Sequence, residues 1–509
     1  MNEVTASISR ASGRRVIVAI TLLAAIVRLV RIGAQSLWVD EMLTLEVATP
    51  KPGISLLQLL LHNIHGPLHT FVVALMRLVS ENDGWLRLPS AVAGTFSVPL
   101  LYAWVRPRFG ARAAAWAALL LAVNPLHIHY SQELRNYAFT VFFVLAGCVM
   151  LDRVCARWSF PRAAGFAACV AGAVLSNFSA CFTFLVQSLV FFRAQPARGR
   201  ALARWLVIAG LVILITSPWI YRVTTYVDFG KLATPVRPGE LAETERLRGD
   251  TTFRIESIPY AFYAYSVGFA LGPTLAEMHG DLDRVLSGHR GAIAWTALVF
   301  GTLALFGVRR ALRRDDGAWR ALEPVLYVAV PLAATLLLNW QNAKAFNVRY
   351  VLVGLPMYLA LVGLGIAGGK RRDGTIIAGA LVLATTAVAL RNYYTDPARW
   401  KEDVRGATRA IEARLAPGEC IFAPTVFHIV AHYQETGAPL HYIYRGNREL
   451  TDREFRELFA ACPSFWYLRA RPWVDDADGY VLSTLESKYR RDAVMEFPGV
   501  TALHFVPRN

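Results

Sequence analysis

The chain has 509 residues, of which 55% are hydrophobic and only 18% are charged, and its mean hydropathy is +0.37. Soluble domains carry about 25% charged residues, so this composition argues against a soluble globular protein. The net charge of +16 does not indicate nucleic acid, because the arginines lie in short clusters between long apolar blocks, as the positive-inside rule expects. We therefore predict an α-helical polytopic membrane protein.

The first apolar block covers residues 16–30 and follows Arg10, Arg14 and Arg15. No small-residue cleavage site follows the block, so we expect a retained helix with a basic cytoplasmic N-terminus rather than a signal peptide. With ten further blocks this gives about eleven predicted spans. The further blocks cover residues 88–105, 112–126, 135–152, 162–176, 178–193, 203–221, 291–308, 321–338, 349–367 and 375–391.

One shorter apolar block, residues 67–79, decides the topology. Its 13 residues are too few for a span and Arg77 lies near its end, so we interpret it as an interfacial or re-entrant helix. Leaving it out puts the arginine clusters between the spans on the cytoplasmic side. The same count of spans from a cytoplasmic N-terminus places the other loops outside. These are residues 34–87, 127–134, 222–290, 339–348 and the tail after residue 392.

Residues 392–509 are charged and punctuated by proline, which predicts a small soluble α/β domain outside the membrane, appended to a membrane domain of residues 1–391. We expect a helix over residues 400–415. The strand candidates are residues 420–423, 441–444, 465–469, 494–497 and 502–506. Cys420 and Cys462 could form a disulfide on an oxidising side, but two buried free thiols are the interpretation that the sequence favours.

The first outer loop carries an acidic pair, Asp40 and Glu41, directly after the first span. For an isolated acidic pair we favour the interpretation that Asp40 is a helix N-cap with no further role. Further along lie His62, His65 and His69, which share a helix face only if the helix continues through a Gly-Pro pair. A metal site is therefore the minority interpretation.

The second outer loop and its flanks carry Tyr130, Gln132, Glu133 and Arg135 between two clean spans. Aromatic anchoring explains a tyrosine at an interface, whereas ionisable groups there are costly unless they are paired or face a wet cavity. Aromatic and ionisable side chains also lie together at the start of the tenth span.

Near that tenth span lie Lys344, Arg349 and Tyr350. Cations on the outer side oppose the positive-inside trend, so they need another reason, and a lipid phosphate is the natural one. Outer carboxylates beside outer cations suit transfer of a glycosyl group from a polyprenyl phosphate. A base deprotonates the acceptor hydroxyl, cations hold the departing phosphate, and no general acid is needed.

At these residues the chain resembles the GT-C membrane glycosyltransferases, in particular the superfamily of protein O-mannosyltransferases and lipid A aminoarabinose or galacturonic acid transferases. The resemblance covers most of the first 400 residues. Four segments of this chain match motifs of the family. Leu37–Glu41 matches Leu-Trp-x-Asp-Glu, Arg87–Ala91 matches Arg-Leu-Pro-Ser-Ala, Tyr130–Tyr137 matches Tyr-Ser-Gln-Glu-x-Arg-x-Tyr, and the fourth is Arg349-Tyr350.

The resemblance implies an inverting transfer with Asp40 as the catalytic base and Glu41 supporting it or binding the acceptor. Arg87, Arg135 and Arg349 would line the site, with Lys344 and Tyr350 as further donor contacts. The family's His-Pro-Pro or Lys-Pro-Pro element appears as His65-Gly66-Pro67, which leaves His65 as the candidate phosphate contact. Tyr130, Gln132 and Glu133 would line the acceptor side. No metal ligand set or cofactor is firmly implied, and a divalent metal is not required.

The implied partners are a polyprenyl-phosphate sugar donor, a glycolipid, polysaccharide or protein acceptor, and the bilayer itself. The alternative function is a transporter or flippase of lipid-linked sugars, but such proteins usually show internal repeats and midplane polar groups. The Ala/Arg-rich composition suggests a bacterium, so we expect a multi-pass protein of the inner membrane, with the active site and tail on the periplasmic or extracellular side.

Overall fold

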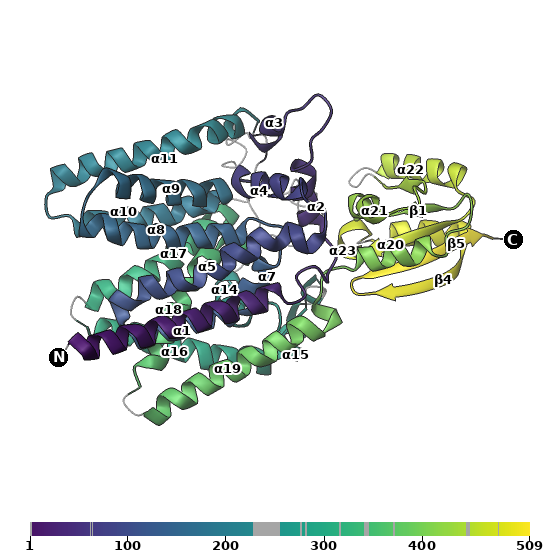
Figure 1. The fold of residues 1–509 in the computed structure, drawn as a ribbon. Coiled ribbons are helices and arrows are strands. Elements are labelled where there is room, and N and C mark those ends of the chain that lie inside the picture. The colour runs from purple at the N-terminus through teal and green to yellow at the C-terminus, as the bar shows by residue number, and fades with distance from the viewer. Residues whose placement is uncertain are drawn as a thin grey trace.

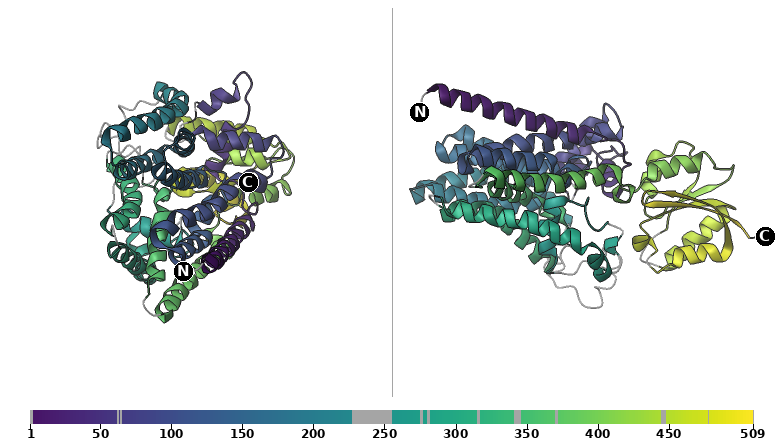
Figure 2. Two further views of the ribbon diagram at one scale, coloured as in Figure 1. Left: turned by 60° about the vertical axis from the view of Figure 1, so that its left-hand side comes forward. Right: turned by 90° about the horizontal axis from the view of Figure 1, so that it is seen from below.

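The structure is a computed structural model of a long helical bundle with a small sheet domain at one end (Figures 1 and 2). It describes residues 3–61, 63, 65–226, 255–274, 277–279, 282–314, 317–340, 346–369, 372–443, 448–476 and 478–508. The first described residues and the C-terminus lie at opposite ends of the molecule (Figure 1).

A helix lies at each of the eleven predicted apolar blocks. In chain order these are α1 (Glu3–Leu29), α5 (Asp83–Phe109), α6 (Ala111–Val123), α8 (Tyr137–Ala156), α9 (Phe160–Ser176), α10 (Cys181–Ala194), α11 (Arg198–Tyr226), α15 (Leu282–Thr296) with α16 (Thr302–Leu312), α17 (Gly317–Trp340), α18 (Leu355–Ala367) and α19 (Arg372–Thr395). Their axes run along the length of the bundle (Figure 2).

The number of spans is not confirmed as eleven. By length and composition, six helices in the described part of the chain could cross a membrane, or up to seven if the bent pair α6 and α7 (Pro125–Ser131) is one span. Three apolar helices, α9, α10 with its preceding turn, and α18, are shorter than the ~20 residues that a span needs when it stands alone. The helical membrane architecture agrees with the prediction.

The predicted inner and outer segments gather at opposite ends of the bundle. At one end, Arg108 of α5 donates to Asp152 of α8 (Nη1–Oδ2, 2.7 Å) and to Glu323 of α17 (Nη2–Oε1, 2.9 Å). At the other end, Arg349, which opens the tenth predicted span after one outer loop, pairs with Asp40 of the first predicted outer loop. The parity that placed these loops on a common side therefore agrees with their contacts.

The break between α6 and α7 positions the second outer loop. The two helices meet at 55°, where Pro125 interrupts the backbone ladder after Asn124. Arg28 of α1, which is fully buried, donates to the carbonyls of Leu121 (Nη2, 3.1 Å) and Ala122 (Nη1, 2.9 Å). A buried cation thus satisfies carbonyls that a broken helix would leave bare in an apolar surrounding.

Short helices lie at the end of the bundle that faces the sheet domain (Figure 1). They are α2 (Val39–Val47), α3 (Leu56–Leu61), α4 (Pro67–Arg77) and α14 (Ser257–Val267). Helix α4 is the predicted non-spanning block, and it has 11 residues. In the described chain it is not among the candidate spans, in agreement with the interfacial interpretation.

The sheet domain has five strands in the order β2-β1-β3-β5-β4. They are β1 (Cys420–Phe422), β2 (Leu440–His441), β3 (Phe465–Ala470), β4 (Tyr489–Phe497) and β5 (Val500–Pro507). The pairs β1–β2 and β1–β3 are parallel, and β3–β5 and β4–β5 are antiparallel. Each strand overlaps a predicted one, so the small α/β domain is confirmed.

Helices cover both faces of this sheet. One core joins alternate strand residues, such as Ile421 and Trp466, to α20 (Val404–Glu412) and α21 (Phe427–Tyr433). The other joins Cys420 and Phe465 to α22 (Arg448–Ala461) and α24 (Tyr480–Lys488). The short helix α23 (Pro472–Asp475) follows β3.

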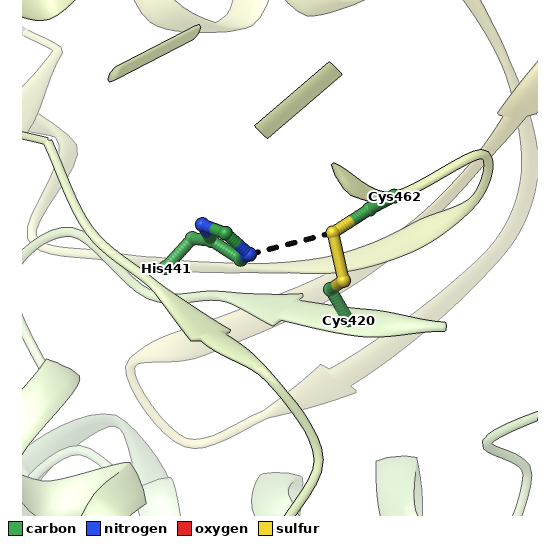
Figure 3. Close-up of side chains that lie close together, drawn as sticks. All are labelled: Cys420, His441 and Cys462. Carbon is green, nitrogen blue, oxygen red and sulfur yellow. Dashed lines mark hydrogen bonds between the residues drawn. A yellow bond between two sulfur atoms is a disulfide. The ribbon is translucent and has the colours of Figure 1, made fainter. Parts of the chain in front are cut away.

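The interpretation of Cys420 and Cys462 as free thiols is wrong, because the two form a disulfide (Figure 3). Cys420 opens β1 and Cys462 lies just before β3, and these strands are direct parallel neighbours. Strand pairing that the sequence does not reveal brings their Cα atoms to 5.9 Å, within the range that a disulfide requires.

Candidate active site

The predicted acidic pair lies on α2, the helix that faces the sheet domain (Figure 1). Glu41 is in the first turn of α2, where its Oε2 accepts the backbone N–H of Trp38 at 3.4 Å. This contact is half of a capping box, and it is made by Glu41 rather than by Asp40, the residue expected to cap the helix. The remaining contacts of Glu41 go well beyond capping.

Arg87 of α5 forms a two-point ion pair with Glu41. Its Nε lies 2.8 Å from Oε1 and its Nη2 lies 2.8 Å from Oε2, and the two side chains are 1% and 0% exposed. The other N–H groups of Arg87 donate to the carbonyls of the preceding loop, at Ile32, Gln35 and Ser36. A guanidinium has five N–H donors, and Arg87 uses all of its donors within the protein.

Glu41 also accepts the backbone N–H of Leu134 (Oε1, 2.6 Å) and lies 3.1 Å from Lys401 Nζ (Oε2). Burial alone would raise the pKa of Glu41, but the charges of Arg87 and Lys401 outweigh burial and hold that pKa below its usual range. Glu41 is therefore an ionised anchor between α2, α5 and the second outer loop, with its oxygens already occupied.

Glu133 is the second buried carboxylate of the cluster. Its Oε1 lies 3.2 Å from Lys401 Nζ and 3.1 Å from His129 Nε2, and its side chain is 1% exposed. Burial raises the pKa of Glu133, whereas Lys401 and then His129 lower it, and the net direction is downward. Glu133 thus joins α7 to the chain that follows α19.

Asp40 differs from both glutamates, because 22% of its side chain is exposed. Its Oδ2 pairs with Arg349 Nη1 and lies 3.9 Å from Arg135 Nη2. Arg135 also donates from Nη1 to the Asp40 carbonyl at 3.0 Å and to Thr44 Oγ1 at 2.9 Å. Asp40 is therefore the carboxylate of the cluster that solvent and a substrate can reach.

The two arginines beside Asp40 share an aromatic wall. Arg135 lies 5.7 Å and Arg349 lies 5.9 Å from the centre of the Tyr137 ring, and Arg349 also lies 5.3 Å from that of Tyr350. The Nε atoms of both arginines are buried without a hydrogen-bond partner in the described structure. Two guanidinium groups with unused donors beside one carboxylate form an anion-binding arrangement.

Other predicted residues lie at the edge of this cluster or outside it. Tyr130 is buried, with its ring centre 5.0 Å from that of Tyr137, so it backs the aromatic wall. Gln132 donates from Nε2 to the carbonyls of Arg28 at 2.9 Å and Val30 at 2.7 Å, and its Oε1 accepts from Tyr393. Gln132 therefore ties α7 to α1 and α19 and does not face Asp40.

Of the histidine and lysine candidates, His65 and His69 lie among the described residues. His65 is exposed, and its backbone N–H bonds Asn63. Lys344 and His62 lie outside the described residues. His69 is buried with Nε2 3.2 Å from Ser90 Oγ, and burial, with Arg135, lowers its pKa to about 3. This neutral, hydrogen-bonded histidine is a packing residue rather than a ligand.

Gly66, the departure from the family's Pro-Pro pattern, has a steric reason. A Cβ at Gly66 would lie 2.1 Å from the carbonyl oxygen of Leu175, at the end of α9. The backbone at the start of α4 therefore approaches α9 too closely for any side chain.

Among the described residues, Cys420, His441 and Cys462 form a group whose ligand atoms lie within 4.8 Å of one another (Figure 3). The two sulfur atoms are joined in the disulfide, which leaves His441 without a thiolate partner for an ion. This group lies in the sheet domain, apart from Asp40.

Lys401 is the site residue that sequence reasoning missed. It follows α19 in a charged stretch of the tail, where a lysine carries no distinguishing pattern. Its one visible signal is its place directly beside Trp400, close to the predicted membrane boundary, and that signal does not identify its partners.

Comparisons with known proteins found similarities in sequence and in fold. Residues 64–221 match the family described as Dolichyl-phosphate-mannose-protein mannosyltransferase. A stretch of 88 residues is 34% identical to "Putative mannosyltransferase YycA" of Bacillus subtilis (strain 168); it covers 17% of this chain and 13% of that relative. ArnT from Cupriavidus metallidurans in the apo state has a TM-score of 0.57 at 14% identity, over 97% of this chain and 98% of its own. Bound to undecaprenyl phosphate, it gives 0.52 at 14% identity, over 96% and 97%.

The likeness to ArnT spans nearly the whole chain and shows that this chain has the same fold. The family match covers residues 64–221, in the first part of the bundle.

Proposed function

We propose that the protein transfers a glycosyl group from a polyprenyl-phosphate-linked sugar to an acceptor hydroxyl on the outer face of its membrane. The transfer would invert the anomeric carbon and use Asp40 as the general base. The observation that carries this proposal is the partly exposed Asp40 held between Arg135 and Arg349. A carboxylate beside two cations provides both a base and an anion site, which the transfer requires.

Arg349 and Arg135 are the proposed donor-phosphate contacts, and Tyr350 is the aromatic neighbour of Arg349. Each arginine has a buried Nε without a partner in the described structure, which leaves donor capacity for phosphate oxygens. ArnT, which shares the fold, has been solved with undecaprenyl phosphate, and this supports a lipid-linked donor. Arg87 is not among the proposed contacts, because Glu41 and three carbonyls already occupy its donors.

Donor binding would also activate Asp40. Without donor, Arg349 occupies the Asp40 carboxylate as its ion-pair partner. A phosphate that takes over Arg349 and Arg135 would release Asp40 for the acceptor. The base would then become available when the donor is in place.

The chemistry follows from these roles. Asp40 removes the proton of the acceptor hydroxyl while the oxygen of that hydroxyl attacks the anomeric carbon from the face opposite to the phosphate. The bond from the anomeric carbon to the phosphate oxygen breaks, and polyprenyl phosphate departs as an anion beside the two arginines. Inversion results from the single displacement, and no general acid is needed because the leaving group is already stable as an anion.

The membrane setting remains part of the proposal. The site and the sheet domain would face the periplasm or cell exterior of a bacterial inner membrane, because the arginine-rich ends of the spans lie at the opposite end of the bundle. A membrane domain of residues 1–391 would bind the donor, and residues 392–509 would form the outer domain. The acceptor would be a glycolipid, a polysaccharide or a protein.

A transfer assay tests the proposal directly. Purified protein in lipid nanodiscs is mixed with radiolabelled undecaprenyl-phosphate sugars and with membrane glycolipid, polysaccharide or protein fractions. We expect donor-dependent labelling of one acceptor class with release of undecaprenyl phosphate. Movement of intact donor across liposome membranes without labelling would favour a flippase and contradict the proposal.

A further inference from the structure

One lysine from the sheet-domain side bridges both buried carboxylates of the site. Lys401 lies between α19 and α20, and its side chain is 13% exposed. Its Nζ is 3.1 Å from Glu41 Oε2 and 3.2 Å from Glu133 Oε1. Because Glu41 belongs to α2 and Glu133 lies between α7 and α8, one ammonium group joins two segments that are far apart in the chain.

The charge balance makes this bridge necessary. Glu41 and Glu133 are both buried, and the charge of Glu133 by itself raises the pKa of Glu41. Glu41 has Arg87 as a second cation, whereas Glu133 has His129, which is charged only if it is protonated. Without Lys401, the buried pair would take up a proton or move apart.

The bridge is linked directly to the reacting groups. Asp40 immediately precedes Glu41, and Arg135 follows Glu133 and donates to the Asp40 carbonyl at 3.0 Å. A shift of Glu133 relative to Glu41 would therefore move Arg135 relative to Asp40.

Other contacts join the segment of Lys401 and the sheet domain to α2 and the loop before it. The backbone N–H of Lys401 bonds Gln35 Oε1 at 3.0 Å, and the hydroxyl of Ser36 donates to the Glu402 carbonyl. Val39 and Met42 of α2 pack against a core of the sheet domain. Helix α2 thus lies between the bundle and the sheet domain and is fixed from both sides.

We propose that Lys401 is a positioning residue for glycosyl transfer, which holds Glu41 and Glu133 together and thereby keeps Asp40 aligned with Arg135 and Arg349. This inference rests on the proposed function. In this role, the segment that leads into the sheet domain contributes to the active site without contacting the substrate.

A charge-compensation experiment tests the role. Lys401→Met keeps most of the aliphatic stem and removes the charge, and Lys401→Met combined with Glu133→Gln removes one charge of each sign. We expect Lys401→Met to lower kcat on the order of 10- to 100-fold with little change in the KM for donor, since small misplacements of reacting groups have effects of this size. The double variant should recover to within about threefold of wild type. Lys488→Met, a lysine over the Phe459 ring in the sheet domain, is the matched control and should retain activity.

The pH profile adds a readout that a purely structural role would not move. In Lys401→Met the carboxylate pair should bind a proton at higher pH, so the acid limb of kcat should move upward and return in the double variant. The groups that face the pair from neighbouring elements are Arg87 of α5, His69 of α4, His129 and Tyr130 of α7, the N–H groups of Trp38 and Leu134, and Tyr393 of α19.

Hydrogen exchange of the α2 amides measures positioning without turnover. Faster exchange in Lys401→Met, reversed by Glu133→Gln, would support the proposal even if no transfer by the wild type were found, in which case the proposed function alone would fail. Unchanged exchange and kcat in Lys401→Met would overturn the inference. A raised donor KM that Glu133→Gln does not rescue would also overturn it, because Lys401 would then be a substrate contact.

Discussion

The buried pair of Arg87 and Glu41 offers a test of how helix α2 is held in place. Arg87→Met would remove two hydrogen bonds to Glu41 and three to the carbonyls of Ile32, Gln35 and Ser36, in a site where both charged side chains are at most 1% exposed. Removing one member of a buried pair costs ~3–5 kcal/mol. Glu41 keeps Lys401 and the Leu134 N–H, so we expect the lower end, ~3 kcal/mol.

The assay is a double-mutant cycle on Arg87→Met and Glu41→Gln, with unfolding by SDS titration of protein in mixed micelles. The free energy of unfolding should fall by ~3 kcal/mol in Arg87→Met, and the coupling energy between the two substitutions should be ~2 kcal/mol. Arg87→Lys should recover only part of the loss, because a single ammonium cannot reach both the carboxylate and the carbonyls. A coupling below ~0.5 kcal/mol would refute the anchoring role of the pair.

Three further predictions address the donor site, the packing and the topology. Arg349→Ala should weaken donor binding by tenfold or more, roughly one charge-assisted contact, and Arg349→Lys should restore it only partly; unchanged donor affinity would show that Arg349 is only an anchor. Gly66→Ala should lower stability by ~1–3 kcal/mol, because its Cβ would lie 2.1 Å from the Leu175 carbonyl oxygen, and an unaltered melting temperature would contradict that packing. Reporters fused after Arg314 and after Asn509 should score cytoplasmic and external, respectively, and a cytoplasmic C-terminal reporter would overturn the orientation.

The sequence was sufficient to predict the helices and the gathering of Asp40, Arg135 and Arg349 at one end of the bundle, because both follow from local physical rules. Apolar blocks long enough for a bilayer form helices wherever they occur. The position of basic residues then assigns each loop to a side. Asp40, Arg135 and Arg349 come from three different loops, and the parity argument alone was enough to expect them at one end.

The sequence could not predict which residues of the cluster are exposed and which are buried in ion pairs, because this depends on the fold and on contacts between distant segments. Asp40 and Glu41 are neighbours in an acidic pair, and only the fold shows that one is partly exposed while the other is sealed by Arg87 and Lys401. The motif predicts that Gln132 lines the site, but its side chain forms hydrogen bonds with α1 and α19 instead.

The contact of Lys401 spans most of the chain, which explains why no local pattern reveals it. Glu41 and Lys401 are separated by 360 residues. The Cys420–Cys462 disulfide was missed for a related reason, since it depends on the parallel pairing of β1 with β3. Register between distant strands is set by the folded sheet and not by the short apolar runs themselves.

The most direct test of the central claim is the turnover of Asp40→Asn measured together with its donor affinity. Asparagine keeps the size of the side chain, but it cannot remove the proton of the acceptor hydroxyl. The account predicts donor binding at least as tight as in wild type, because Arg349 loses its counter-ion, and turnover lower by ~10²- to 10⁴-fold, or about 2.7–5.5 kcal/mol. Asp396→Asn, at a capping aspartate paired with Arg399 outside the cluster, is the matched control and should retain activity. Turnover of Asp40→Asn within a few-fold of wild type would contradict the account.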